Sequence, residues 1–305
     1  MTAVGLAITM YQRAKASSKR IDHVLAIQSD TPSPLKPLNP ALMKGKIEFK
    51  NLSFKFPQSE EYVLKNISLK IEPGTRVAFL GTIGSGKSAL LSLLPRLYPI
   101  ERGMLFIDDI DINDWSLEDL RRQVGFVGQD VFLFSESVLE NISFGLQEWT
   151  QKKEIYFDLA KEVTNLASVH EDIARFMNAY ETKLGERGVN LSGGQKQRLT
   201  IARALAKNPC ILVLDDALSS VDVQTEEMIL ASLRKREKRN TEIIAAHRIS
   251  TVQDADLIVV IDKGIIRQLG THNELLTDRR GAYRRYYEQQ QLKEDLENYV
   301  QTLHP

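Results

Sequence analysis

A glycine-rich octapeptide, GTIGSGKS at residues 81–88, constrains the fold of this chain more than any other segment. A short apolar run, RVAFLG at residues 76–81, precedes it, and a helix-forming run, SALLSLLPRL, follows it. The glycines let the backbone curl so that several N–H groups face one point, and the start of a helix adds positive potential there. Lys87 can place a cation on the β- and γ-phosphates of a nucleotide, and the Ser88 hydroxyl can ligate Mg²⁺. The segment therefore predicts a strand–loop–helix unit that binds nucleotide phosphates.

The pattern of strands and helices around this loop indicates an α/β fold. ILVLD at residues 211–215 and EIIAA at residues 242–246 are short apolar runs, typical of strands buried on both faces. Because helical patterns separate such strands, we expect a P-loop NTPase-like core with a mainly parallel sheet. The strand patterns at residues 46–56 and 63–71 predict an antiparallel β subdomain, and residues 130–208 predict an all-α insertion.

The two ends of the chain predict helices outside this core. Residues 1–28 begin with ten mostly apolar residues and then turn basic, which is too short an apolar stretch to span a bilayer. This helix either packs on the domain or is the cytoplasmic end of a transmembrane or intracellular helix whose earlier part is missing; the basic flank favours the second reading. The proline-rich residues 29–43 predict a linker, residues 44–280 a compact domain and residues 281–305 a final helix.

Composition excludes several function classes. Lys plus Arg and Asp plus Glu are 40 each, so the chain lacks the basic excess of most nucleic-acid-binding proteins. Cys210 is the only cysteine, so no internal disulfide is possible, and its place at the start of an apolar strand predicts a buried, inert thiol.

Two further motifs extend the nucleotide site. Asp215 ends the strand ILVLD, where its carboxylate can hold Mg²⁺ through water; a lone aspartate there would equally suit a helix cap. LSGGQ at residues 191–195 opens another helix and predicts a second anion-binding nest. One nucleotide hardly needs two nests from one domain, whereas two facing copies of the domain would use both.

In this order, the motifs resemble the nucleotide-binding domain of an ATP-binding cassette (ABC) transporter over residues 44–280. The resemblance implies ATP and Mg²⁺ as cofactors. The nucleotide-binding positions that it implies are Phe56, Gly81, Thr82, Ile83, Gly84, Ser85, Gly86, Lys87, Ser88 and Ala89. The signature residues that it implies for contact with the opposing subunit's ATP are Leu191, Ser192, Gly193, Gly194 and Gln195.

The resemblance also implies individual roles. Lys87, Gln129, Asp216 and His247 would be catalytic, and Ser88, Gln129 and Asp215 would hold the metal. Ser219 and Asp222 in SSVD match a loop that contacts the opposing subunit, although Asp222 could instead be a helix N-cap. Phe56 could stack on adenine or face the core, and a lone histidine such as His247 is more often structural.

A short segment before the signature points toward an exporter. Glu186 and Arg187 in GERG match a segment that in ABC exporters couples the nucleotide domain to the membrane domain. The chain is thus similar to a bacterial multidrug-type half-transporter, and the resemblance implies a place at the cytoplasmic face of the inner membrane and export of a drug- or lipid-like substrate. A transmembrane domain and a second half-transporter subunit are the implied partners, and no nucleic acid is expected.

Position 216 departs from the family pattern, because it is aspartate where the family usually has glutamate. Aspartate is one methylene shorter, and a misplacement of about 1 Å at a reacting centre can cost on the order of 100-fold in rate. One hypothesis is a heterodimer in which the Asp216 site is slow and the intact signature serves the partner's site. The alternatives are a homodimer in which aspartate suffices, a non-hydrolysing nucleotide-gated regulatory subunit, or a soluble non-transport ABC ATPase.

Overall fold

The computed structural model describes residues 2–27, 30–34, 43–146, 153–236 and 240–303. The chain divides into two compact units, Met1–Pro32 and Ser33–Pro305. The proline-rich stretch that was expected to form a linker lies largely outside the described residues.

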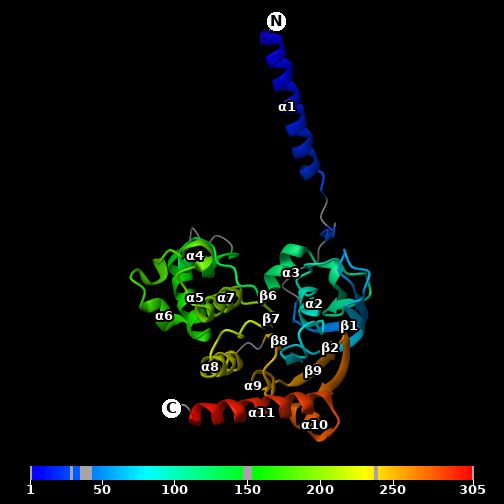
Figure 1. The fold of residues 1–305 in the computed structure, drawn as a ribbon, viewed down its shortest axis with the longest axis vertical. Coiled ribbons are helices and arrows are strands. Elements are labelled where there is room, and N and C mark those ends of the chain that lie inside the picture. The colour runs from blue at the N-terminus through cyan, green and yellow to red at the C-terminus, as the bar shows by residue number, and fades with distance from the viewer. Residues whose placement is uncertain (1, 28–29, 35–42, 147–152, 237–239, 304–305) are drawn as a thin grey trace. The chain divides into compact units, whose positions relative to one another are not determined.

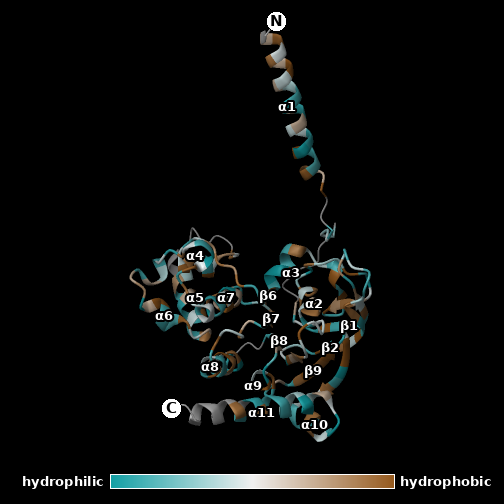
Figure 2. Cartoon of the chain, viewed as in Figure 1, coloured by the Kyte–Doolittle hydropathy of each residue, from teal (hydrophilic) through white to brown (hydrophobic). Residues whose placement is uncertain are grey.

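The first unit is built on one helix, α1 (Thr2–Leu25), as its sequence predicts. Apolar and polar residues are mixed along it (Figure 2), with no acidic residue in its first turn. No helix in the described part of the chain is long and apolar enough to cross a membrane.

The second unit is organised around a six-stranded sheet with the order β10-β9-β3-β8-β7-β6 (Figure 1). All neighbours are parallel except the β9–β10 pair. The strands are β3 (Arg76–Leu80), β6 (Val124–Val127), β7 (Ile211–Asp215), β8 (Thr241–Ala246), β9 (Leu257–Asp262) and β10 (Ile265–Gly270). Every residue of β3, β7 and β8 is buried, which explains why their sequences are apolar runs without alternation.

A second, four-stranded antiparallel sheet has the order β2-β1-β4-β5. Its strands are β1 (Ile47–Phe54), β2 (Leu64–Ile71), β4 (Leu105–Ile107) and β5 (Ile110–Asp111). Burial alternates along β2, as expected for a sheet with one face toward the core. This sheet confirms the predicted antiparallel β subdomain.

The helices complete two hydrophobic cores, one on each face of the parallel sheet. Ala78 and Leu80 of β3 face one core, whereas Val77 and Phe79 face the other. The first core includes residues of α4 (Val138–Ser143), α5 (Lys153–Leu166), α6 (His170–Ala174), α7 (Gly193–Ala206), α8 (Val223–Arg234), α9 (Ile249–Val252), α10 (His272–Thr277) and α11 (Ala282–Leu303). The second includes residues of α2 (Lys87–Ser92) and α3 (Leu117–Gln123). Short 3-10 turns lie at Ile112–Asp114, Ala179–Glu181 and Glu186–Gly188.

The predicted α/β class, all-α insertion and final helix are thus observed, and one helix is shorter than its sequence suggests. The run SALLSLLPRL forms α-helix only to Ser92 and continues in tighter turns, in which the Leu93 and Leu94 amides donate to carbonyls three residues back. Pro95 explains the early end, because the residue before a proline is disfavoured in the α conformation.

Candidate nucleotide-binding site

The loop between β3 and α2 is shaped by glycines, as its sequence predicts. Gly84 and Gly86 have φ values of 78° and 107°, in the left-handed region that favours glycine. A Cβ atom at Gly86 would also lie 2.9 Å from the Leu64 Cδ2 atom, and one at Gly81 would collide with the Ile261 carbonyl oxygen on β9. The loop therefore curls tightly against the neighbouring strands.

Two buried polar side chains of this loop fit an anionic ligand. The Ser85 Oγ atom is buried and has no hydrogen-bond partner among the described residues. The Lys87 side chain is also buried, and its Nζ atom donates to the carbonyl oxygens of Gly81 at 2.8 Å and Thr82 at 3.2 Å. Burial lowers the pKa of Lys87, although the nearby Asp216 and Asp215 carboxylates oppose this effect. A phosphate in the loop would supply an acceptor for the Ser85 hydroxyl and a negative charge beside the Lys87 ammonium group.

Ser88 and Asp215 come together although 127 residues separate them. The Ser88 Oγ atom donates to the Asp215 Oδ1 atom at 2.9 Å, because α2 begins beside the end of β7. Burial raises the pKa of Asp215, while the bond from Ser88 acts in the opposite direction. The described residues include no group of three or more His, Cys, Asp and Glu that could hold a metal ion. This small oxygen set fits Mg²⁺, which usually takes one or two protein carboxylates and completes its shell with water and substrate phosphates.

Asp216 and His247 form a second polar pair at the ends of neighbouring strands. The His247 Nε2 atom lies 3.0 Å from the Asp216 Oδ2 atom, with the aspartate side chain 9% exposed and the histidine side chain 40% exposed. Asp216 has a left-handed backbone, with φ of 49°, which aspartate tolerates better than most residues. Its amide donates to the Ala245 carbonyl at 3.0 Å, so β8 fixes both members of the pair.

Most of these groups, though not Asp215, line one cleft of about 360 Å³. The predicted site residues that line it are Phe56, Ile83, Gly84, Ser85, Gly86, Lys87, Ser88, Ala89, Gln129, Asp216, Ser219 and His247. Gly81, Thr82 and Asp215 do not line this cleft, and neither do the five signature residues. Such a volume suits a small-molecule ligand, and the cleft therefore gathers one half of the predicted nucleotide site.

Phe56 follows β1 and contacts both the core and the cleft. Its ring packs edge-on against Phe54 and Tyr98, with centroid distances of 5.2 Å and 5.1 Å. It is half-buried against the second core and also lines the cleft. Packing fixes the ring, and its remaining surface is placed where a planar base could contact it.

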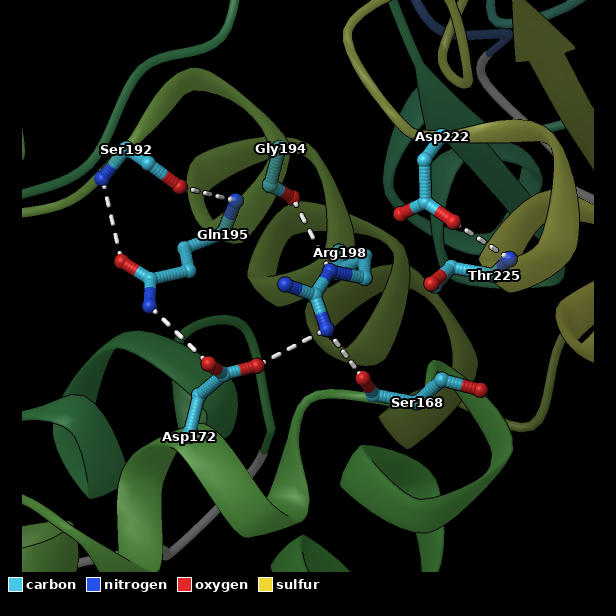
Figure 3. A network of polar contacts seen from close by, with 8 residues as sticks. All are labelled: Ser168, Asp172, Ser192, Gly194, Gln195, Arg198, Asp222 and Thr225. Carbon is cyan, nitrogen blue, oxygen red and sulfur yellow. Dashed lines mark hydrogen bonds and ion pairs between the residues drawn. The ribbon is translucent and has the colours of Figure 1, made fainter.

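The signature motif forms a capped helix start (Figure 3). The Ser192 Oγ atom accepts from the Gln195 amide at 3.2 Å, and the Gln195 Oε1 atom accepts from the Ser192 amide at 3.0 Å. The Gln195 Nε2 atom also donates to Asp172 of α6 at 3.1 Å. A Cβ atom at Gly194 would lie 2.9 Å from the Ser220 carbonyl oxygen, so glycine is needed for this close approach. The motif is held rigidly at the start of α7.

Comparison with known proteins identifies the family. The family model described as "ABC transporter" matches residues 64–219, half of the chain. This chain belongs to the ABC transporter family. The "Putative multidrug export ATP-binding/permease protein YgaD" of Bacillus subtilis is 46% identical over 77% of this chain and 39% of its own length. The "Probable multidrug resistance ABC transporter ATP-binding/permease protein YheI" of the same species is 41% identical over 96% of this chain and 48% of its own length.

A solved structure leads to the same conclusion. The chain is similar to a bacterial Atm1-family ABC exporter with ATP bound, with a TM-score of 0.86 and 32% identity over 94% of this chain and 49% of that chain. The chain thus spans about half the length, or less, of the relatives it matches. The resemblance to an ABC nucleotide-binding domain is confirmed.

Two residues that support the site in this ABC domain are not predicted from the sequence. Gln197, buried on α7, donates to the Ser219 Oγ atom at 3.0 Å and accepts from the Ser220 amide at 2.8 Å. It thereby ties the signature helix to the loop that follows Asp216. Asp172 of α6 accepts from Arg198 at 2.8 Å as well as from Gln195 (Figure 3). Neither residue stands in a motif with its partners, so sequence spacing gave no signal.

The remaining predicted residues occupy surface positions. Asp222 is the N-cap of α8 and accepts from the Thr225 amide at 2.9 Å, so it has the helix-capping role that its sequence position allowed. Glu186 and Arg187 are exposed on a 3-10 turn, in which Arg187 has a φ of 51°. Their side chains are accessible to another protein surface.

Proposed function

We propose that this chain is the ATP-binding and ATP-hydrolysing motor domain of an ABC exporter and drives efflux of a drug- or lipid-like substrate. The observation that carries the proposal is the single cleft lined by Lys87, Gln129, Asp216 and His247. The multidrug names of YgaD and YheI support the exporter assignment. The site would work at the cytoplasmic face of a bacterial inner membrane, with α1 as the end of a transmembrane or intracellular helix.

The cleft residues divide the work of ATP binding. The loop amides and Lys87 hold the phosphates, and Phe56 offers its ring to the adenine. Ser88, Gln129 and Asp215 would hold Mg²⁺, which when bound neutralises charge on the phosphate oxygens. His247, which lines the same cleft, would contact the γ-phosphate.

A second subunit would complete this site. The signature residues line no part of their own chain's cleft, and their rigid cap presents the α7 start outward. In an ATP-dependent dimer, each signature would cover the other subunit's nucleotide, and Ser219 and Asp222 would approach the facing subunit. Glu186 and Arg187 would contact the transmembrane domain.

Asp216 would make this site slow. Its carboxylate is one methylene shorter than the glutamate usual in the family and is already paired with His247. A general base must reach its water within about 3 Å, so a recessed carboxylate polarises the water poorly. We therefore infer a heterodimer with a second half-transporter that carries the glutamate, while this chain's intact signature serves that partner's site. The same Asp216–His247 contact favours one alternative, a nucleotide-gated regulatory subunit that binds ATP without hydrolysing it.

The test is Mg²⁺-dependent ATP hydrolysis by this chain over a range of protein concentrations, with Asp216→Glu in parallel and Lys87→Ala as blank. We expect a slow parent and an Asp216→Glu variant about tenfold or more faster. A parent as fast as the glutamate variant, with both above the blank, would replace the heterodimer by a homodimeric ATPase. A parent at the blank that still binds ATP would favour the regulatory subunit.

A further inference from the structure

The C-terminal helix α11 reaches the histidine of the cleft through one side chain. The Gln290 Oε1 atom accepts from the Ile249 amide at 2.7 Å, and its Nε2 atom donates to the His247 carbonyl oxygen. These partners lie 41 and 43 residues away in the sequence. We propose that Gln290 is a positioning residue for His247, an inference that rests on the proposed ATPase function.

The position of His247 depends on such an anchor because the neighbouring side chains do not confine its ring. Its side chain is 40% exposed, so packing alone does not hold the ring. A small cavity of about 80 Å³ adjoins it, lined by apolar residues such as Leu214, Ala246 and Leu218 and by both members of the Asp216–His247 pair. A small shift of the backbone after β8 would move the imidazole away from Asp216 and from the phosphate loop.

The neighbouring residues are anchored to a different helix. The Arg248 Nη1 atom donates to Glu226 of α8 at 3.0 Å and to the Val221 carbonyl at 3.3 Å. Glu226 is 3% exposed and also accepts from the Thr251 hydroxyl. The side chains of residues 248 and 251 are thus tied to α8, whereas the backbone on either side of residue 248 is tied to α11. Gln290 therefore adds a restraint that Arg248 does not supply.

Helix α11 is itself fixed well enough to act as a support. Tyr283 is 0% exposed within the first core, and its hydroxyl lies 2.6 Å from the His272 Nδ1 atom. Gln290 follows Tyr283 by about two helical turns, on the same side of the helix. Through Gln290, the fixed helix thereby restrains the backbone that carries His247.

The test compares Gln290→Ala and Gln290→Glu with Gln289→Ala, an exposed neighbour of the same residue type. For Gln290→Ala we expect kcat for ATP hydrolysis to fall about tenfold, with KM changed less than about twofold, because the interaction acts on the reacting centre. Gln290→Glu keeps the acceptor for the Ile249 amide but, once ionised, cannot donate to the His247 carbonyl, so its kcat should be intermediate. Gln289→Ala should match the parent.

Two readouts that do not depend on activity accompany the kinetics. Hydrogen exchange of the Ile249 amide should speed up in Gln290→Ala and stay slow in Gln290→Glu. The NMR signals of the His247 ring should shift most in Gln290→Ala and less in Gln290→Glu. Unchanged ring signals in Gln290→Ala, or an equal loss of kcat in Gln289→Ala, would overturn the inference. A parent no faster than the Lys87→Ala blank would instead overturn the proposed ATPase function, and the ring signals would then decide the role of Gln290.

Discussion

The phosphate loop and the signature motif are both serine- and glycine-containing turns that open a helix, yet their polar side chains differ in how fully they are hydrogen-bonded. In the loop, the Ser85 hydroxyl has no partner among the described residues, and the Lys87 Nζ atom donates to two carbonyl oxygens. In the signature, Ser192 and Gln195 satisfy each other (Figure 3). The loop therefore lacks contacts that a ligand would supply, whereas the signature is already assembled.

The neighbouring carboxylates show the same contrast. Burial raises the pKa of Asp215 beside the loop, because a charged group loses water contacts there. Hydrogen bonds from Thr225 lower the pKa of the exposed Asp222 beside the signature. Substitutions at the loop should therefore change ligand binding by a single chain, whereas substitutions at the signature should change folding stability and the activity of the proposed dimer.

The largest expected effect is the loss of ATP affinity in Lys87→Ala. A charge-assisted contact is worth about 1.5–3 kcal/mol, so the dissociation constant for Mg·ATP should rise roughly 10- to 100-fold. Isothermal titration of the single chain with ATP measures it, with Lys65→Ala on the exposed face of β2 as a matched control. An equal loss of affinity in both variants would show that general charge, rather than the loop, governs binding.

The next effect concerns the link between the two regions. Gln197→Ala removes both bonds to the 219–220 loop and leaves buried groups unpaired, which should cost about 2 kcal/mol of the free energy of unfolding. Urea denaturation measures this change, and ATP affinity of the single chain should stay within about twofold of the parent. Gln197→Glu, which keeps the acceptor for the Ser220 amide, should retain part of the stability. A loss of ATP affinity without a loss of stability would contradict the expectation that the loop governs ligand binding and the signature region governs folding stability.

The contacts that these predictions use divide into those that sequence could and could not reveal. The phosphate loop and the strand that ends at Asp215 could be predicted because each is a local sequence pattern. The loop has glycines at fixed spacing, and the strand is an apolar run before an acidic residue. The capping box at Ser192 and Gln195 is local in the same way, since its partners lie three residues apart.

The long-range contacts could not be read in this way. Gln195 meets Asp172 across 23 residues, Gln197 meets Ser219 across 22, and Gln290 meets Ile249 across 41. Each contact joins two segments that share no sequence motif, and only the packing of helices on the sheet decides which partner a side chain meets. The shortened α2 is a different case, since Pro95 lies inside the run SALLSLLPRL that predicts the helix and marks its early end in the sequence itself.

A smaller effect is expected at the signature itself. Ser192→Ala removes the N-cap acceptor of α7, and losing such a cap costs about 1 kcal/mol. Thermal unfolding should report this loss, with Ser192→Thr as a control that keeps the hydroxyl. Because the signature lines no part of its own cleft, the single chain should bind ATP as the parent does. Weaker ATP binding by the monomeric variant would place the signature in its own chain's site and remove the reason for a second subunit.

The smallest effect, and the one with a defined pH dependence, is expected at Asp222. The folded-state pKa of this cap is lowered from 3.8 by its bonds to Thr225, so its contribution to stability is present above that value and is lost as pH falls through the lower, folded-state pKa. At neutral pH the parent should melt a degree or two above Asp222→Asn, which keeps a neutral cap, and further above Asp222→Ala. The advantage over the asparagine variant should shrink on acidification toward pH 3, because only the aspartate gains a proton. A melting-temperature difference from Asp222→Asn that stays constant across this range would mean that the cap acts through its hydrogen bond alone. The charge of Asp222 would then contribute nothing to the stability of the α8 start.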